Sequence, residues 1–374
     1  MTTVPADRAG ALRKRRRGVR IVLVALGVVP VVLTALIARY VDTNIHYYER
    51  DMADLARAGI VPKQADVDGH VVSYAEGPDI GPAMLLIHGQ GSQWQDHAKV
   101  LSELVARHHV FAVDVPGHGG SGRLPADQYT NVRVSQLLAT FVERVVGSPV
   151  LVSGHSSGGL LAASLAAERS DLVTGVLLED PPLYSSTPQR LAGTVGGGLP
   201  RLAQEFLRDG AATDFTRHYV QNGDYFSFFG ALAQPIVGYA SQYLEAHPGE
   251  PLEVFFLPPL VNVFFRGLVH YDPAFGAAFE DGRWYSGFDT DATLAAVTCP
   301  VVLLHTNFWS EQYGTYYSDD GVLMAAMDDQ DVARALDLLQ DAELMEVASG
   351  HLVHFEQPER YLEAVTRLEA RTGS

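Results

Sequence analysis

Cysteine and basic side chains are both scarce in this 374-residue sequence. The single cysteine, Cys299, cannot form a disulfide within the chain, and its place at the start of an apolar run favours a buried structural thiol. Lysine and arginine together number 27 against 44 aspartates and glutamates, which gives a formal net charge of −17. Because binding of nucleic-acid phosphates needs basic side chains, we expect no nucleic-acid partner.

The sequence also lacks internal repeats, low-complexity tracts and motifs for binding a metal or a nucleotide. Its composition, 47% hydrophobic and 19% charged, is that of an ordinary globular protein. We therefore expect any chemistry to be carried by side chains and backbone amides, with no cofactor and no metal.

Long hydrophobic runs without charge are confined to the N-terminus. Residues 21–38 read IVLVALGVVPVVLTALIA, which is near the lower limit for a membrane-spanning helix. Residues 1–20 carry seven basic side chains and one acid, a charge of +6, so the other 354 residues carry −23. This asymmetry predicts a basic cytoplasmic tail (1–20), a single-pass membrane anchor (21–40) and an extracytoplasmic body. The alternative is a cleaved export signal, for which Leu36-Ile37-Ala38 is a poor cleavage site.

The body is expected to have an α/β fold. Seven apolar runs alternate with helical segments and are mostly continuous, as is typical of strands buried on both faces of a mostly parallel sheet. We expect a linker helix over residues 41–64 and a core formed by residues 65–182 and 298–374, with helices on both faces of the sheet. Residues 183–297 lack strand patterns and are rich in aromatic side chains, which predicts a helical cap inserted into the core.

The stretch GHSSG, residues 154–158, lies between an apolar run and an alanine-rich helical segment. A serine in this setting is held on a sharp turn between a strand and a helix, with small neighbours that let the two elements approach each other. We therefore interpret Ser156 as a candidate nucleophile. A serine needs a base to accept its proton, and His351, after the last predicted strand, is the candidate. His354 is the competing histidine, for which a structural role is favoured.

Four stretches together resemble the α/β-hydrolase fold superfamily: HGQG, DVPGHGGSG, GHSSGG and GHLVHFEQP, in this order along the chain. The resemblance covers roughly residues 65–370 and implies a sheet of the α/β-hydrolase type. It also implies that Ser156 is the nucleophile and His351 the base. The backbone amides of Gln90 and Ser157 would then stabilise the oxyanion.

The acidic member of the expected triad is not fixed by the sequence. Family members usually carry it just after the seventh strand, where this chain has Trp309. Asp180, at the end of the sixth predicted strand, is our first choice, and Glu311 is the second. Other aspartates have simpler interpretations: Asp114 lies in a structural turn, and Asp328 and Asp329 cap a helix. Asp319 and Asp320 lie in an acidic loop and are weaker candidates.

These residues predict a membrane-anchored serine hydrolase that acts on carboxylic esters through an acyl-enzyme on Ser156. The aromatic cap favours a small apolar or lipid-like acyl substrate. Two alternatives remain open at this point. The same residues support cofactor-free perhydrolase chemistry of the haloperoxidase type, and the missing acid after the seventh strand favours a non-catalytic binding or sensing protein.

Overall fold

The computed structural model describes residues 6–210, 214–307 and 316–373, with side chains described from Val28 onward. An eight-stranded sheet in the order β1-β2-β4-β3-β5-β6-β7-β8 forms the centre of the body. Its strands are β1 (Val61–Val67), β2 (His70–Glu76), β3 (Ala83–Ile87), β4 (His109–Val113), β5 (Val150–His155), β6 (Val173–Glu179), β7 (Val301–Thr306) and β8 (Ala342–Val347). β2 pairs antiparallel with both β1 and β4, and the pairs from β4 to β8 are parallel. The expected α/β fold with a mostly parallel sheet is confirmed.

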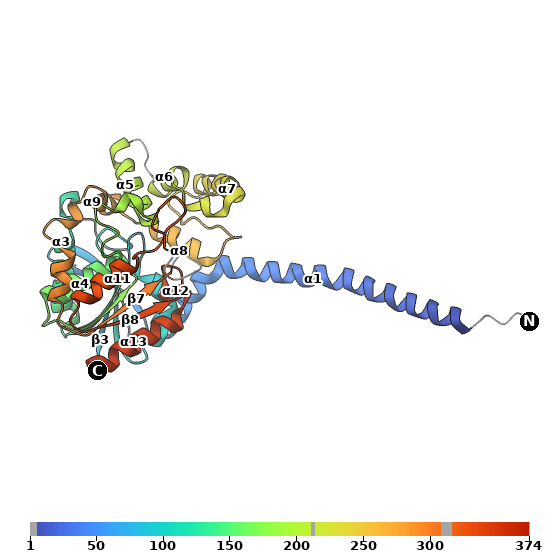
Figure 1. The fold of residues 1–374 in the computed structure, drawn as a ribbon, viewed down its shortest axis with the longest axis horizontal. Coiled ribbons are helices and arrows are strands. Elements are labelled where there is room, and N and C mark those ends of the chain that lie inside the picture. Colours follow the sequence, from blue (N-terminus) through green and yellow to red (C-terminus); the bar gives the residue numbers. More distant parts are fainter. Residues whose placement is uncertain (1–5, 211–213, 308–315, 374) are drawn as a thin grey trace, which may run out of the picture.

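Helices cover both faces of the sheet (Figure 1). One face carries α3 (Asn131–Phe141), α4 (Ser157–Glu168), α10 (Thr290–Ala296) and α11 (Asp329–Leu338), and the other carries α2 (Ala98–Leu104) and α13 (Pro358–Thr372). The strands contribute alternate residues to the two cores. In β5, for example, Val150 and Val152 pack in one cluster and Leu151 in the other. Both faces of the central strands are therefore buried, which explains their continuous apolar sequences.

The register of the parallel strands brings their carboxyl ends to one edge of the sheet. Ile87 of β3 is opposite Gly154 of β5, and His155 of β5 is opposite Glu179 of β6. The loops that follow β3, β5, β6 and β8 contain Gln90, Ser156, Asp180 and His351, so the topology gathers the predicted site residues at this edge.

The N-terminal helix α1 (Ala6–Arg57) is continuous and projects away from the body in Figure 1. The part of α1 whose side chains are described, Val28–Arg57, is long and apolar enough to cross a membrane, and little of its apolar stretch is buried. The expected anchor and linker are thus one helix. The linker prediction was wrong at its end, since α1 stops at Arg57 and residues 61–64 belong to β1. Gly59, with φ +84°, ends the helical path there.

The segment between β6 and β7 is helical, and much of it lies above the carboxyl edge of the sheet (Figure 1). It contains α5 (Gly198–Asp209), α6 (Phe215–Asn222), the 3₁₀ segment η6 (Tyr225–Leu232), α7 (Ala233–Ala246), α8 (Pro259–Leu268) and α9 (Pro273–Glu280), before α10 returns the chain to the sheet. We keep the name cap for residues 183–297. Many of its aromatic side chains, including Phe275 and Trp284, are buried within it.

Candidate active site

Ser156 lies on a strained turn between β5 and α4. Its backbone has φ 54° and ψ −124°, a conformation that residues other than glycine rarely adopt. The positions around Ser156 must be glycine because there is no room for a Cβ. A Cβ on Gly154 would lie 2.3 Å from the carbonyl oxygen of Gly158, and one on Gly158 would lie 2.4 Å from that of Ile87. The strand, the helix and the neighbouring strand β3 are therefore packed too closely for any larger residue.

The loop after β3 passes directly beside Ser156. A Cβ on Gly89 would be 2.8 Å from the Cβ of Ser156. Two buried histidines fix this loop: Nε2 of His88 accepts from the amide of Val115 (2.9 Å), and Nε2 of His118 accepts from the amide of Gly91 (3.1 Å). Burial lowers the pKa of both rings, so both are neutral near pH 7.

The two predicted oxyanion amides belong to these elements. Within the described residues, the amide of Gln90 donates no hydrogen bond to another protein group. Its side-chain amide instead donates to the hydroxyl of Tyr271 in the cap at 2.5 Å. Ser157 is the first residue of α4, where a backbone N–H has no partner inside its own helix. Both amides are thus free to bind an external acceptor.

His351 forms a hydrogen bond with Asp180 across 171 residues of sequence. Nδ1 of the imidazole donates to Oδ2 of the carboxylate at 2.6 Å. Asp180 is fully buried, and it also accepts from the amide and the hydroxyl of Thr306 at 3.1 and 2.9 Å. Burial would raise the pKa of Asp180, but its hydrogen bonds and the facing imidazoles of His305 and His351 lower it to about 2. The carboxylate is therefore ionised and leaves Nε2 of His351 as the proton acceptor.

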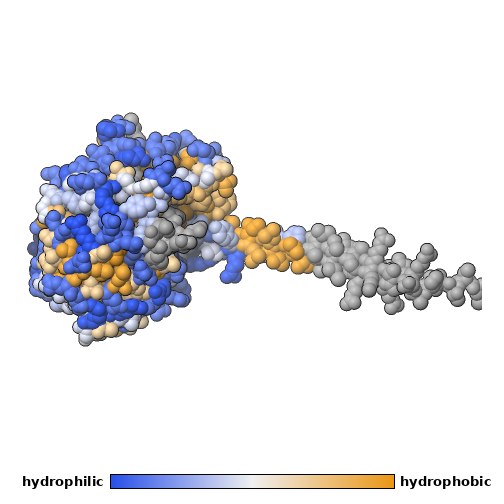
Figure 2. Space-filling view, viewed as in Figure 1, coloured by the Kyte–Doolittle hydropathy of each residue, from blue (hydrophilic) through white to orange (hydrophobic). Residues whose placement is uncertain are grey.

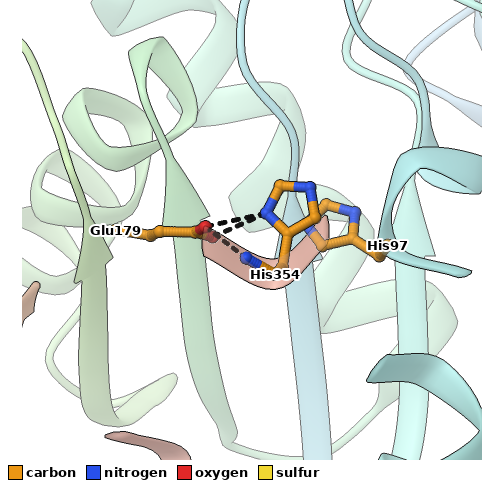
Figure 3. Close-up of side chains that lie close together, drawn as sticks. All are labelled: His97, Glu179 and His354. Carbon is orange, nitrogen blue, oxygen red and sulfur yellow. Dashed lines mark hydrogen bonds and ion pairs between the residues drawn. The ribbon is translucent and has the colours of Figure 1, made fainter. Parts of the chain in front are cut away.

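Further buried residues hold the segment that carries His351. Nε2 of His155, the residue before Ser156, donates to the carbonyl oxygen of His351 at 3.0 Å. The carboxylate of Glu179 contacts the backbone N–H of His354 at 2.9 Å and its Nδ1 at 2.8 Å (Figure 3). These contacts tie the ends of β5 and β6 to the loop after β8. The sequence reasoning missed Glu179 and His155, although each is the immediate neighbour of a predicted site residue.

One group of buried side chains in the described part of the chain has the composition of a metal site. Ligand atoms of His97, Glu179 and His354 lie within 4.8 Å of one another. The rings of His97 and His354 are stacked, with centroids 4.3 Å apart and planes inclined by 23°, so the lone pairs of the two rings lie in nearly parallel planes (Figure 3). Both oxygens of Glu179 already face Nδ1 of His354. Because ligands must point at a common centre, this arrangement fits a hydrogen-bonded structural group better than a metal site.

Side chains of the cap cover the loop after β3 that carries Gln90, which we call the oxyanion loop. Atoms of Leu199, Phe264 and Leu268 would lie 3.2 to 3.7 Å from a Cβ on Gly91. Apolar side chains of the cap thus lie over Gly91, and Tyr271 is a polar neighbour of the Gln90 side chain.

The structure describes only some of the remaining acidic candidates. Glu311 and Trp309 are outside the described residues. Asp114 accepts from the amides of Trp94 and Gly120, both at 2.9 Å, as expected of a structural turn. Asp328 caps α11 by accepting from the amide of Asp331, which confirms its predicted role.

This combination of sheet order, serine turn and inserted cap defines a class of α/β enzymes. The chain belongs to the alpha/beta hydrolase family, whose model matches residues 84–364. It is therefore a hydrolase of this fold.

Individual relatives match over shorter stretches. The chain is 40% identical to Lipase LipV of Mycobacterium tuberculosis over 119 residues, which cover 31% of this chain and 42% of the relative. It is 37% identical to a pimeloyl-[acyl-carrier protein] methyl ester esterase of Chromobacterium violaceum over 98 residues, covering 26% and 36%. The chain thus spans less than half the length of these curated relatives.

A solved structure matches over nearly the whole chain. The crystal structure of a membrane phospholipase A, a bacterial virulence factor, superposes with a TM-score of 0.56 and 20% identity. The match covers 96% of this chain and 99% of that one. At this identity the likeness shows the fold alone.

Proposed function

We propose that this protein is a membrane-anchored serine hydrolase that cleaves carboxylic esters of apolar, lipid-like acyl groups through an acyl-enzyme on Ser156. The observation that carries the proposal is the hydrogen bond from His351 to the buried carboxylate of Asp180, at the sheet edge where Ser156 lies on its strained turn. A serine, an imidazole and an orienting carboxylate are the groups that acyl transfer of this kind requires.

In the proposed reaction, Oγ of Ser156 attacks the ester carbonyl and gives its proton to Nε2 of His351. Asp180 stabilises the imidazolium without taking the proton. The amides of Gln90 and Ser157 donate to the oxyanion, and loss of one such donor costs about 3 to 4 kcal/mol of barrier. His351 then protonates the leaving alcohol. A water molecule, deprotonated by the same imidazole, finally releases the acid from Ser156.

The substrate class is supported by the cap and by the comparisons. Leu199, Phe264 and Leu268 of the cap lie over Gly91, the residue after Gln90. A lipase and an esterase are among the sequence relatives, and a membrane phospholipase is among the structural ones. A lipid-like ester suits these surroundings because burial of its chain on apolar side chains is favourable.

The chain organisation is part of the proposal. Residues 21–40 anchor the protein, residues 1–20 stay in the cytoplasm, and the body lies on the other side of the membrane. Residues 65–182 and 298–374 form the hydrolase core and residues 183–297 form the cap. The basic N-terminus and the apolar length of α1 support this arrangement.

A fluorophosphonate probe tests the mechanism, since it reacts with activated serines. We expect labelling of the wild type, no labelling of Ser156→Ala and normal labelling of Ser157→Ala, which keeps its backbone amide. A panel of esters of increasing acyl length should give the highest kcat/KM for the longer chains. Absence of labelling in the folded wild type would indicate a non-catalytic member of the fold.

A further inference from the structure

Large apolar side chains are exposed on the cap. Phe255 and Phe256, in the loop between α7 and α8, are 40% and 37% exposed, and Leu232, which precedes α7, is 63% exposed. Figure 2 shows hydrophobic surface on the side of the cap that faces along the projecting part of α1. Exposed apolar groups gathered in this way indicate an interaction surface.

Phe255, Phe256 and Tyr239, which we call the cap aromatic cluster, form an ordered group. The rings of Phe255 and Phe256 are 5.0 Å apart, and that of Tyr239 lies 5.8 and 5.6 Å from them. The hydroxyl of Tyr239 donates to the carbonyl of Glu253 at 3.1 Å. The cluster is therefore held in place before any partner binds, and its exposure is a fixed feature of the surface.

Hydrogen bonds attach the cluster to α1 at a defined position along the helix. The hydroxyl of Tyr40 donates to the carbonyl of Phe256 at 3.4 Å, and the side chain of Asn44 donates to that of Phe255 at 3.1 Å. Tyr40 is two residues beyond Ala38, where the apolar run ends, which is about 3 Å along a helix. If residues 21–38 span the hydrocarbon core, the cluster lies at its boundary.

We propose that the cap aromatic cluster inserts into the interfacial layer of the bilayer that α1 crosses. The inference rests on the anchor in the proposed function, and the occupant is the lipid surface. Aromatic rings are favoured at this depth because they combine an apolar body with a polar edge. Residues 21–374 carry −23, so insertion is driven by apolar contact and tolerates salt.

The insertion would connect the bilayer with the site. Helix α8 begins at Pro259, three residues after Phe256, and carries Phe264 and Leu268, which lie over the oxyanion loop. Its ten residues span about 15 Å. Helix α8 therefore runs from the neighbourhood of the cluster to the loop that carries Gln90.

Site-specific fluorescence tests the proposal without using the hydrolase activity. In full-length Cys299→Ser protein, Phe256→Cys carries a nitrobenzoxadiazole label, and Leu207→Cys carries the same label as the control. Leu207 is 46% exposed in α5, on the side of the cap away from α1 (Figure 1). In phosphatidylcholine vesicles we expect a blue shift and a severalfold rise in emission for position 256 only. Lipids with nitroxide-labelled chains should quench that emission, and 0.5 M salt should not change it.

Equal emission from both labels in vesicles, with equal quenching by aqueous iodide, would overturn the proposal. A second result would also overturn the proposal. If the label at position 256 is shielded in detergent, and this shielding increases with protein concentration but does not change when lipid is added, a second copy of the protein covers the cluster. As a second readout, we expect Phe255→Ser/Phe256→Ser to lower hydrolysis of vesicle lipid at least tenfold and to leave hydrolysis of a soluble short-chain ester unchanged. An equal loss of activity on the vesicle lipid and on the soluble ester would contradict the proposal.

Discussion

At the scale of single residues, the protonation of His351 depends on two opposing effects. Burial lowers the pKa of the imidazole, whereas the hydrogen bond and the charge of Asp180 raise it, and the second effect is the larger one. A base must be neutral to accept a proton. The activity is therefore expected to fall on the acid side, at a pH above the ordinary imidazole value of about 6.5.

Replacement of Asp180 by Asn should change both the rate and this pH dependence. Loss of the carboxylate removes the group that orients His351, so we expect kcat/KM for a soluble ester to fall about 10³- to 10⁴-fold. It also removes the charge that raises the pKa of His351, so the acid limb should move to lower pH. Asp171→Asn, a surface change, is the control. If kcat/KM falls less than tenfold and the acid limb of the pH profile does not move, the acid of the triad is another residue, and Glu311 is the next candidate.

The site residues differ in how far the sequence alone could identify them. The turn at Ser156 could be predicted because its local motif encodes it. Asp180 could only be ranked against Glu311, since its contact with His351 depends on strand order and spans 171 positions. Glu179 and His155 were missed for the same reason: their partners are 175 and 196 residues away.

At the scale of elements, the approach of α4 to β3 depends on one missing side chain. We expect Gly158→Ala to lower the free energy of unfolding by about 1 to 3 kcal/mol and to weaken probe labelling, because the added methyl would meet backbone oxygens. Those of Ile87 and His88 would lie 2.4 and 2.5 Å from it. Gly198→Ala is the matched control, since it is also helical and has no atom within 4 Å of a Cβ. Equal denaturation midpoints for the two variants would contradict this account.

Elements with continuous apolar sequences were predictable, and those that depend on distant contacts were not. The seven predicted strands are β2 to β8. The first strand was missed because most of its residues are exposed at the sheet edge, so VPKQADV has no apolar pattern. The cap was predicted as helical, but its individual helices depend on packing between segments, such as α5 against α9.

At the scale of the whole molecule, the distribution of charge predicts the orientation in the membrane. With cleavable tags at both ends, we expect protease added outside intact cells or spheroplasts to remove the C-terminal tag and to spare the N-terminal one. The protein should also stay in the membrane pellet at alkaline pH with its N-terminal tag attached. Release of a shortened, soluble body would instead identify residues 21–38 as a cleaved export signal.

The unbroken course of α1 has a kinetic consequence. The helix continues from its apolar part to Arg57, and Tyr47 and Leu55 near its end are buried against the body. Because the body is packed against the end of one continuous helix, it has little freedom to move relative to α1. In the proposed function, the anchored enzyme meets a lipid substrate by lateral diffusion in two dimensions, so turnover should follow the mole fraction of substrate in the surface and not the amount per volume of solution.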